Sequence, residues 1–277
     1  MKTFIYLIEF ILVKILFILF RIIGYKTSSN LGFFIGKTFG PIFRSKKLII
    51  NNLKKANLNN QDSLEKITSN VLGNYGRIFS EYMHLKNFKN NKLKNYISIK
   101  GLEHLKNLKK TKKRAVFISG HFNNFELMAM QIEKAGIELA TIYRPLNNFF
   151  LNKTMEKIRK EIICKHQIKK GRAGSREIIK NLIKGRSIAL MVDQRVREGK
   201  RVPFFKNLAT TTTIPAQLVK KYNCELIPIY IERNNKHYFK MLISEPIKIN
   251  KNKTTLEITN MLNKVLEKMI LKNIDQW

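Results

Sequence analysis

Two side chains in residues 114–126, which read RAVFISGHFNNFE, could perform acid–base chemistry. The neutral imidazole of His121 can accept a proton from an alcohol that attacks an acyl group, and a nearby carboxylate can fix its tautomer and stabilise the resulting imidazolium. Glu126 stands five residues later and is the candidate carboxylate. Because histidine and glutamate at this spacing are common in proteins, the pair alone is a weak indication of catalysis.

The flanking residues predict that His121 lies at the edge of a sheet. Residues 115–119 form a short apolar run, which is typical of a buried strand. Asn123 or Asn124 could cap a helix that continues to residue 134. Because ligands of open α/β sheets bind outside the carboxyl ends of the strands, this strand-to-helix turn predicts a functional site.

From residue 95 onward, predicted strands and helices alternate, which indicates an α/β fold with a central, mostly parallel sheet flanked by helices. A turn at Asn234 and Asn235 could join the last two strands, and Thr254 and Glu257 form a capping-box pattern before the last helix. The predicted strands are residues 96–99, 115–119, 138–143, 187–192, 225–232 and 237–243. The predicted helices are residues 101–108, 123–134, 147–162, 175–183, 215–222 and 254–270.

The N-terminal part of the chain is predicted to be helical throughout. Residues 4–24 are almost continuously apolar and long enough to cross a bilayer, although Glu9, Lys14 and Arg21 interrupt them. They could form a tilted span or a helix lying in the membrane interface. We expect a membrane anchor over residues 1–26 and a single larger domain, which carries the candidate site, over residues 27–277.

The region between this anchor and the sheet should form further helices. Pro41 could begin a second helix, and Asp62 and Ser63 could cap a third. The basic residues that follow the anchor suggest that the body of the protein stays on the cytoplasmic side of the membrane.

Charge is the outstanding feature of the composition. The chain of 277 residues has 53 Lys and Arg against 19 Asp and Glu, a net charge of +34. Such an excess favours anionic partners, namely an anionic membrane, a phosphorylated glycolipid or an acidic carrier protein. The absence of a basic stripe with interleaved aromatic residues argues against nucleic acid. Cys164 and Cys224 have no metal-binding spacing, and we expect neither a metal nor a cofactor.

Three polar groups follow predicted strands and would face one cleft: His121, Arg144 in the sequence IYRPLNN, and Asp193 with Gln194. Together with GHFNNFE, VPFF and the threonine-rich run before a helix, these motifs resemble the late lipid A acyltransferases. These are the lauroyl and myristoyl transferases of lipopolysaccharide assembly, within the lysophospholipid acyltransferase superfamily. The resemblance covers roughly residues 1–245, with the motifs in the order of the family.

The resemblance implies a mechanism in which His121 deprotonates a substrate hydroxyl, Glu126 orients His121, and the oxygen attacks the thioester of a fatty acyl group. It implies acyl carrier protein as the donor, a lipid A precursor or another anionic lipid as the acceptor, and the inner membrane as the location. The alternative acceptor is glycerol phosphate, a lysophospholipid or another amphiphile. A nucleic-acid-binding protein and an inactive membrane scaffold are the competing classes. Asn123 and Phe125 depart from the common family form, where Gly and Trp are frequent.

We expect Arg144, Asp193, Gln194 and Arg195 to contact substrate. Arg144 could bind phosphate or developing negative charge, or form a structural ion pair, and Asp193 could orient a catalytic group or cap its loop. The remaining candidates have a weaker basis. Arginines that could contact headgroups or lie on the surface are Arg172, Arg195, Arg197 and Arg201; aromatics that could line an acyl path or belong to the core are Phe204 and Phe205; histidines expected to be structural are His84, His104, His166 and His237.

Overall fold

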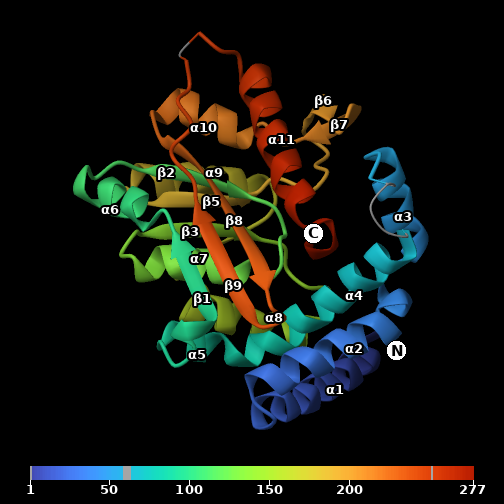
Figure 1. The fold of residues 1–277 in the computed structure, drawn as a ribbon. Coiled ribbons are helices and arrows are strands. Elements are labelled where there is room, and N and C mark those ends of the chain that lie inside the picture. Colours follow the sequence, from blue (N-terminus) through green and yellow to red (C-terminus); the bar gives the residue numbers. More distant parts are fainter. Residues whose placement is uncertain (1, 59–63, 251) are drawn as a thin grey trace.

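The computed structural model describes residues 2–58, 64–250 and 252–277, and it confirms the α/β fold (Figure 1). The described residues form a seven-stranded sheet of order β1-β9-β8-β2-β5-β3-β4. Its neighbours pair in parallel except β8 and β9, which form an antiparallel hairpin. The strands are β1 (Ile97–Lys100), β2 (Ala115–Ser119), β3 (Leu139–Tyr143), β4 (His166–Lys169), β5 (Ser187–Met191), β8 (Glu225–Asn234) and β9 (Tyr238–Ile243).

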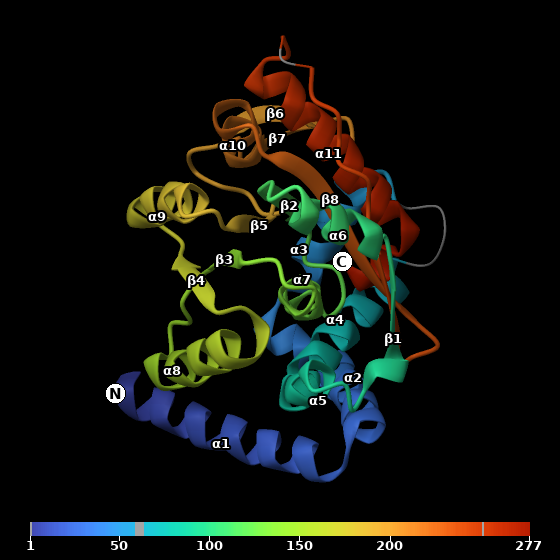
Figure 2. The ribbon, with the colours of Figure 1, turned by 90° about the vertical axis from the view of Figure 1, so that its left-hand side faces the viewer.

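Helices cover both faces of the sheet. Figure 2 shows α7 (Glu126–Lys134) and α8 (Phe149–Ile158) on one side, and α9 (Arg172–Ile183) and α10 (Ile214–Tyr222) on the other. From β2 through β3 to β4 the chain proceeds toward one edge of the sheet, and from β4 through β5 to β8 it proceeds in the opposite direction. Because the crossovers between parallel strands are right-handed, the helices of the first part cover one face and those of the second part cover the other. The remaining sheet-associated helices are α5 (Leu85–Lys89), α6 (Leu102–Lys110) and α11 (Thr255–Lys272).

The central strand β2 forms because its side chains are apolar on both faces. All five of its residues are buried, and Phe117 and Ile118 are at most 2% exposed. A strand covered on both faces requires such a continuous apolar run. Burial of each large apolar side chain stabilises the folded state by about 1.5–3 kcal/mol. The strand therefore fixes the position of the turn that carries His121.

Two N-terminal helices, α2 (Tyr25–Phe43) and α4 (Leu64–Glu81), pack with their backbones in close contact. A Cβ atom added to Gly76 would lie 2.0 Å from the carbonyl oxygen of Gly32, and one added to Gly36 would lie 2.4 Å from that of Leu72. Glycine is therefore required at this crossing for steric reasons. The prediction that Pro41 begins a helix was wrong, since Pro41 lies in the last turn of α2 and the next helix is α3 (Lys46–Lys55).

The N-terminal helix α1 (Lys2–Ile22) lies along the body of the protein (Figure 2). Its Tyr6 ring contacts Phe149 of α8 edge-on, with 6.3 Å between centroids, and the Glu9 carboxylate accepts a hydrogen bond from Asn148 at 2.9 Å. Most of its other apolar side chains are exposed, Ile15 and Ile18 by 58% and 60%. By length and composition α1 could cross a membrane, which is consistent with membrane association.

Some predicted local features are confirmed and others are not. Thr254 and Glu257 form the capping box of α11, and β8 and β9 pair across the predicted hairpin turn. The predicted helix cap at Asn123 or Asn124 is wrong, because the side chains of both asparagines bind elsewhere and α7 begins at Glu126 without a side-chain cap. The cap candidates Asp62 and Ser63 lie outside the described residues.

Three strands were not predicted. The edge strand β4 continues the sheet beyond β3, and β6 (Lys200–Phe204) pairs with β7 (Asn207–Thr211) in a separate antiparallel hairpin. The predicted strands and helices left residues 200–211 without an assigned element. Figure 1 shows this hairpin beside α11 and facing α3. Residues of all three elements line one cavity.

Candidate active site

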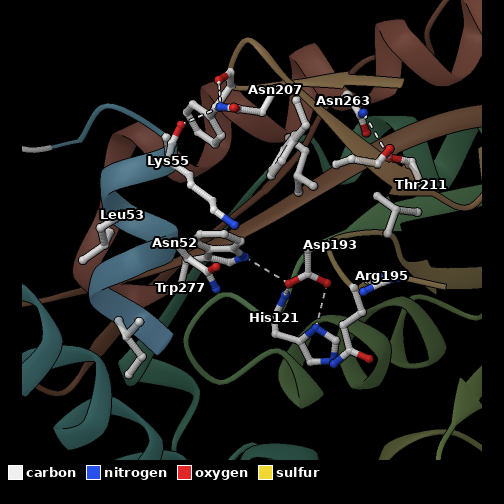
Figure 3. Close-up of a pocket in the computed structure, with 18 of the residues that line it drawn as sticks. Asn52, Leu53, Lys55, His121, Asp193, Arg195, Asn207, Thr211, Asn263 and Trp277 are labelled. Atoms are coloured by element: carbon white, nitrogen blue, oxygen red, sulfur yellow. Dashed lines mark hydrogen bonds and ion pairs between the residues drawn. The ribbon is translucent and has the colours of Figure 1, made fainter. Parts of the chain in front are cut away.

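Sheet register brings His121 and Asp193 together. β2 and β5 are parallel neighbours in which Ser119 is paired with Met191, and His121 and Asp193 each stand two residues beyond that pair. The His121 Nδ1 atom lies 2.8 Å from Asp193 Oδ1, and the backbone N–H of His121 donates to Asp193 Oδ2 at 2.8 Å (Figure 3). The two adjacent strand ends thus place an imidazole directly against a carboxylate.

This contact assigns the tautomer of the imidazole. Since a carboxylate only accepts hydrogen bonds, the Nδ1 atom of His121 carries the proton in the neutral ring and Nε2 keeps its lone pair. The Nε2 atom lies 3.4 Å from the side-chain nitrogen of Gln194, a long contact that an incoming hydroxyl could replace. The His121 side chain is 23% exposed, so its Nε2 atom can meet a ligand.

The carboxylate of Asp193 is held as an anion by the groups around it. Burial by itself raises its pKa, but the hydrogen bond from the His121 ring and the positive charge of that ring, followed by the bonds from the His121 backbone and the indole of Trp277, outweigh burial and lower the pKa below the usual value. The indole Nε1–H donates to Asp193 Oδ2 at 3.0 Å. The only ion pair of Asp193 within the described residues is with His121, which is charged only when protonated.

A cavity of about 850 Å³ opens beside His121, within the range of small-molecule sites. It lies between α3, α4, the β6–β7 hairpin and α11, and Figure 3 shows the labelled side chains around it. Its lining combines an apolar surface with cationic groups. The apolar side chains include Leu48, Leu53, Val71, Phe204, Phe205, Leu208 and Leu266, and the cations are Arg44, Lys55, Arg195 and Arg201.

Polar contacts fix the hairpin that forms one wall of this cavity. Asn207 Nδ2 donates to the backbone carbonyl of Lys55 at 2.6 Å and so joins the hairpin to the end of α3. Asn263 of α11 donates to the carbonyl of Pro203 at 2.8 Å and to the hydroxyl of Thr211 at 3.2 Å. The cavity is therefore built by segments from both ends and the middle of the chain.

Glu126, the predicted orienting acid, has other partners. Its Oε1 atom accepts a hydrogen bond from Arg159 Nε at 3.1 Å and another from the hydroxyl of Tyr82. Burial and the charge of Glu126 raise the pKa of Tyr82 well above its usual value, so Tyr82 acts as a neutral donor. Among the described residues, the His121 ring donates a hydrogen bond to the carboxylate of Asp193, and no hydrogen bond joins the ring to Glu126.

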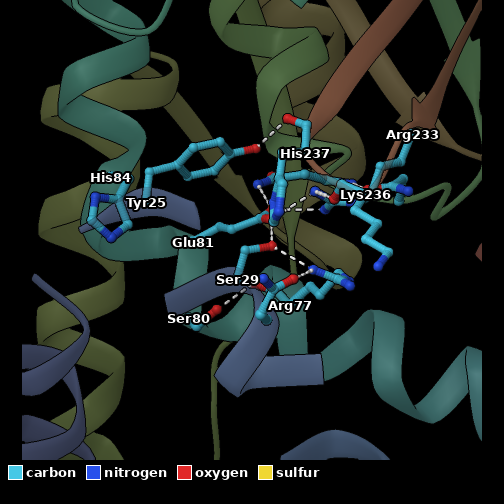
Figure 4. Close-up of polar contacts among 12 residues, drawn as sticks. Tyr25, Ser29, Arg77, Ser80, Glu81, His84, Arg233, Lys236 and His237 are labelled. Carbon is cyan, nitrogen blue, oxygen red and sulfur yellow. Dashed lines mark hydrogen bonds and ion pairs between the residues drawn. The ribbon is translucent and has the colours of Figure 1, made fainter. Parts of the chain in front are cut away.

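A second buried carboxylate supports the loop that carries His121 (Figure 4). Glu81 is fully buried and forms an ion pair with Arg233, with 2.8 Å between Arg233 Nη1 and Glu81 Oε1. Glu81 also accepts hydrogen bonds from Ser29 at 2.7 Å and from Asn124 at 2.9 Å. These contacts join α2, α4 and β8 to the residues that directly follow His121.

The structure brings some of the predicted substrate contacts together and leaves others apart. His121, Asp193, Gln194 and Arg195 line the cavity, whereas Arg144 follows β3, is exposed and does not line it. Among the weaker candidates, Arg201, Phe204 and Phe205 also line the cavity, and Arg197 does not. The side chain of Arg172 lies outside what the structure describes.

Sequence reasoning missed Trp277 and the partners of Glu126. Trp277 lies 84 residues from Asp193 in the sequence, and no local pattern connects the two. The one available signal for a role of Trp277 was that the chain contains a single tryptophan. Arg159 and Tyr82 lie 33 and 44 residues from Glu126 in the sequence, and no local pattern connects either of them with it.

Comparison with known families identifies the chain. All 277 residues, 1–277, match the family model described as bacterial lipid A biosynthesis acyltransferase. The chain therefore belongs to this family and is an acyltransferase of lipid A biosynthesis. A search of curated proteins finds no match.

Proposed function

We propose, from the premise that the chain is a bacterial lipid A biosynthesis acyltransferase, that it moves a fatty acyl chain from acyl carrier protein to a hydroxyl of a lipid A precursor. In this proposal His121 is the general base and Asp193 orients it. The observation that supports it is the 2.8 Å contact between His121 Nδ1 and Asp193 Oδ1 at the wall of an apolar, cation-bearing cavity.

The choice of Asp193 over Glu126 as the orienting acid rests on their partners. Glu126 is paired with Arg159, a permanent cation, so its charge is already compensated. Among the described residues, the groups that donate hydrogen bonds to Asp193 stay neutral until His121 accepts a proton. A carboxylate in that state stabilises the imidazolium as it forms, which lowers the barrier to proton transfer.

The reaction follows from these positions. The acceptor hydroxyl replaces the Gln194 amide at His121 Nε2 and gives its proton to the ring as the oxygen attacks the thioester carbonyl carbon. The new C–O bond forms, the tetrahedral intermediate collapses, and the C–S bond breaks. The proton passes from His121 to the leaving sulfur, so the products are an ester and the thiol of the carrier. Arg195 and Arg201 of the cavity are placed to stabilise negative charge on the substrates.

The composition of the cavity suits an amphiphilic substrate. Its apolar wall suits an acyl chain, and its cations suit the phosphates of a lipid A precursor. The net charge of +34 favours encounter with an acidic acyl carrier protein and with an anionic membrane.

The exposed apolar side chains of α1 support membrane attachment. We propose that residues 1–26 anchor the domain of residues 27–277 at the inner membrane, with the site on the cytoplasmic side, where the carrier protein and its acyl thioester are made. Replacing Ile11, Ile15 and Ile18 with serine should release the protein from membranes, whereas replacing the buried Phe17 should destabilise the fold instead. Sedimentation with vesicles that contain anionic lipid measures the difference.

The decisive experiment compares two histidines of equal exposure. The side chains of His121 and His104 are 23% and 22% exposed. His121→Ala should reduce kcat by about 10²–10⁴-fold, and His104→Ala should leave it within about twofold. The assay uses the full chain in detergent with acyl carrier protein thioester and a lipid A precursor. Retention of activity by His121→Ala would reject the mechanism.

The acceptor is tested separately. Parallel assays with a lipid A precursor, glycerol phosphate and a lysophospholipid should show transfer to the first only. Mass spectrometry of lipid A from cells with and without the chain should show the loss of one secondary acyl group. Preferential transfer to glycerol phosphate or a lysophospholipid would support the alternative acceptor class.

A further inference from the structure

The segment after α11 lies against the candidate active site, where Trp277 lines the cavity (Figure 3). The indole Nε1–H of Trp277 donates to Asp193 Oδ2 at 3.0 Å. The preceding residue, Gln276, bonds to Asn123, which is two residues beyond His121, by a backbone contact and a side-chain contact of 2.8 Å each. The segment thus contacts Asp193 directly and, through Asn123, the loop that carries His121.

We propose that Trp277 is a positioning residue for acyl transfer: its indole N–H holds the Asp193 carboxylate in the rotamer that directs Oδ1 at the His121 ring. This inference rests on the function proposed above for His121. Gln276 contributes by holding the loop that carries His121.

The geometry of the carboxylate explains why such a donor matters. Asp193 Oδ1 meets the His121 ring, while Oδ2 receives the backbone N–H of His121 and the indole N–H of Trp277. Donors on both oxygens fix the plane of the carboxylate, as a preorganised site requires. Without the indole, Oδ2 keeps one donor and faces the cavity, where water and substrate compete for it.

The position of Trp277 is set by independent contacts of its own segment. Gln276 Oε1 also accepts from the backbone N–H of Arg233 at 2.8 Å, and Asn273 donates to Glu232 at 2.7 Å. Asn70 of α4 donates to Asp275 at 3.3 Å. These bonds anchor the segment to β8 and α4. They thereby fix the position of the indole beside Asp193.

A spectroscopic test uses the single tryptophan of the chain. The ¹⁵N-labelled indole of the full chain in detergent should give one N–H resonance, which Asp193→Asn should shift because the hydrogen bond to a charged acceptor is lost. The matched control is Asp275→Asn, a carboxylate of the same segment that bonds to Asn70 and not to the indole. An unmoved resonance in Asp193→Asn, or equal shifts in both variants, overturns the inference.

A kinetic test separates positioning from substrate binding. Trp277→Phe keeps an aromatic ring and removes the N–H, so kcat should fall by about 10- to 100-fold, the loss expected for one hydrogen bond to a charged group, while KM changes less than about threefold. Tyr238→Phe, which removes a polar hydrogen from an exposed ring on β9, is the control. A raised KM at normal kcat, or unchanged kinetics, overturns the inference.

The two proposals fail in different ways. If His121→Ala keeps its activity, the proposed function fails whatever Trp277→Phe does. If His121→Ala is inactive while Trp277→Phe is fully active, only the positioning role fails. The resonance measurement keeps Trp277 in place and therefore does not depend on whether Trp277→Phe folds.

Discussion

Two buried carboxylates of this protein have different kinds of partner. Glu81 is paired with the guanidinium of Arg233 at 2.8 Å and has no contact with the large cavity (Figure 4). Asp193 lines that cavity and accepts hydrogen bonds from the His121 ring, the His121 backbone and the indole of Trp277. One acid faces a permanent cation, and the other faces a group that becomes a cation only by accepting a proton.

Under the proposed function, this difference assigns a structural role to Glu81 and a chemical role to Asp193. A buried charge is costly unless it is paired, and a permanent pair makes its position rigid without any response to a reaction. The charge of a carboxylate without a permanent cationic partner is not yet compensated, so it can stabilise an imidazolium that forms beside it. Glu126, which is paired with Arg159, resembles Glu81 in this respect.

The largest effect should follow the loss of charge at Asp193. Asp193→Asn keeps the shape of the side chain but no longer compensates the imidazolium, so kcat should fall by about a thousandfold. The unfolding midpoint should change little. Steady-state kinetics and thermal unfolding of the same preparation measure both, and activity within threefold of the unmodified protein would remove the distinction between the two acids.

Glu81→Gln should act mainly on stability. It leaves Arg233 buried without its counter-charge, so the free energy of unfolding should fall by about 3 kcal/mol. Denaturant unfolding measures the loss, and the remaining folded protein should keep most of its kcat. Glu103→Gln is the control, because that side chain is 75% exposed. Equal stabilities of the two variants would show that the Glu81 pair does not hold the helices to the sheet.

Glu126→Gln should give a smaller loss of stability, about 2 kcal/mol, because its pair with Arg159 is less completely buried. Its kcat should fall less than that of Asp193→Asn. The comparison is informative in either direction. A loss of kcat as large as that of Asp193→Asn at unchanged stability would return the orienting role to Glu126.

The smallest effect concerns pH. Burial raises the pKa of Asp193, but the hydrogen bonds and charge of His121, together with the indole of Trp277, outweigh burial, so the pKa is lowered in the folded protein. A lowered folded pKa means that its contribution to stability is full above the unfolded value, about 3.9, and disappears as pH falls through the folded value. The difference in unfolding free energy between the unmodified protein and Asp193→Asn should therefore be constant near neutral pH and shrink below about pH 4. A difference that grows there would contradict the assignment.

Local patterns predicted the elements that depend on near neighbours. The apolar run of β2, the capping box at Thr254 and the hairpin turn after Asn234 all carry their signals within a few residues. The β6–β7 hairpin lacked such a signal, because its turn residues Phe205 and Lys206 adopt positive φ angles without Asn or Gly. Pro203 is also unfavourable inside a sheet, because proline has no backbone N–H to donate. Both strands of an isolated two-stranded hairpin are edge strands, so β6 can contain a proline.

The sequence by itself determined the α/β fold, the apolar N-terminal helix, the strand that ends before His121 and the family to which the chain belongs. Tertiary structure alone decided which acid meets His121. Asp193 lies 72 residues away and reaches the imidazole because β5 is the parallel neighbour of β2, whereas Glu126 is carried by α7 to Tyr82 and Arg159. Strand adjacency depends on how the apolar faces of all the elements pack together, and no spacing along the chain encodes it.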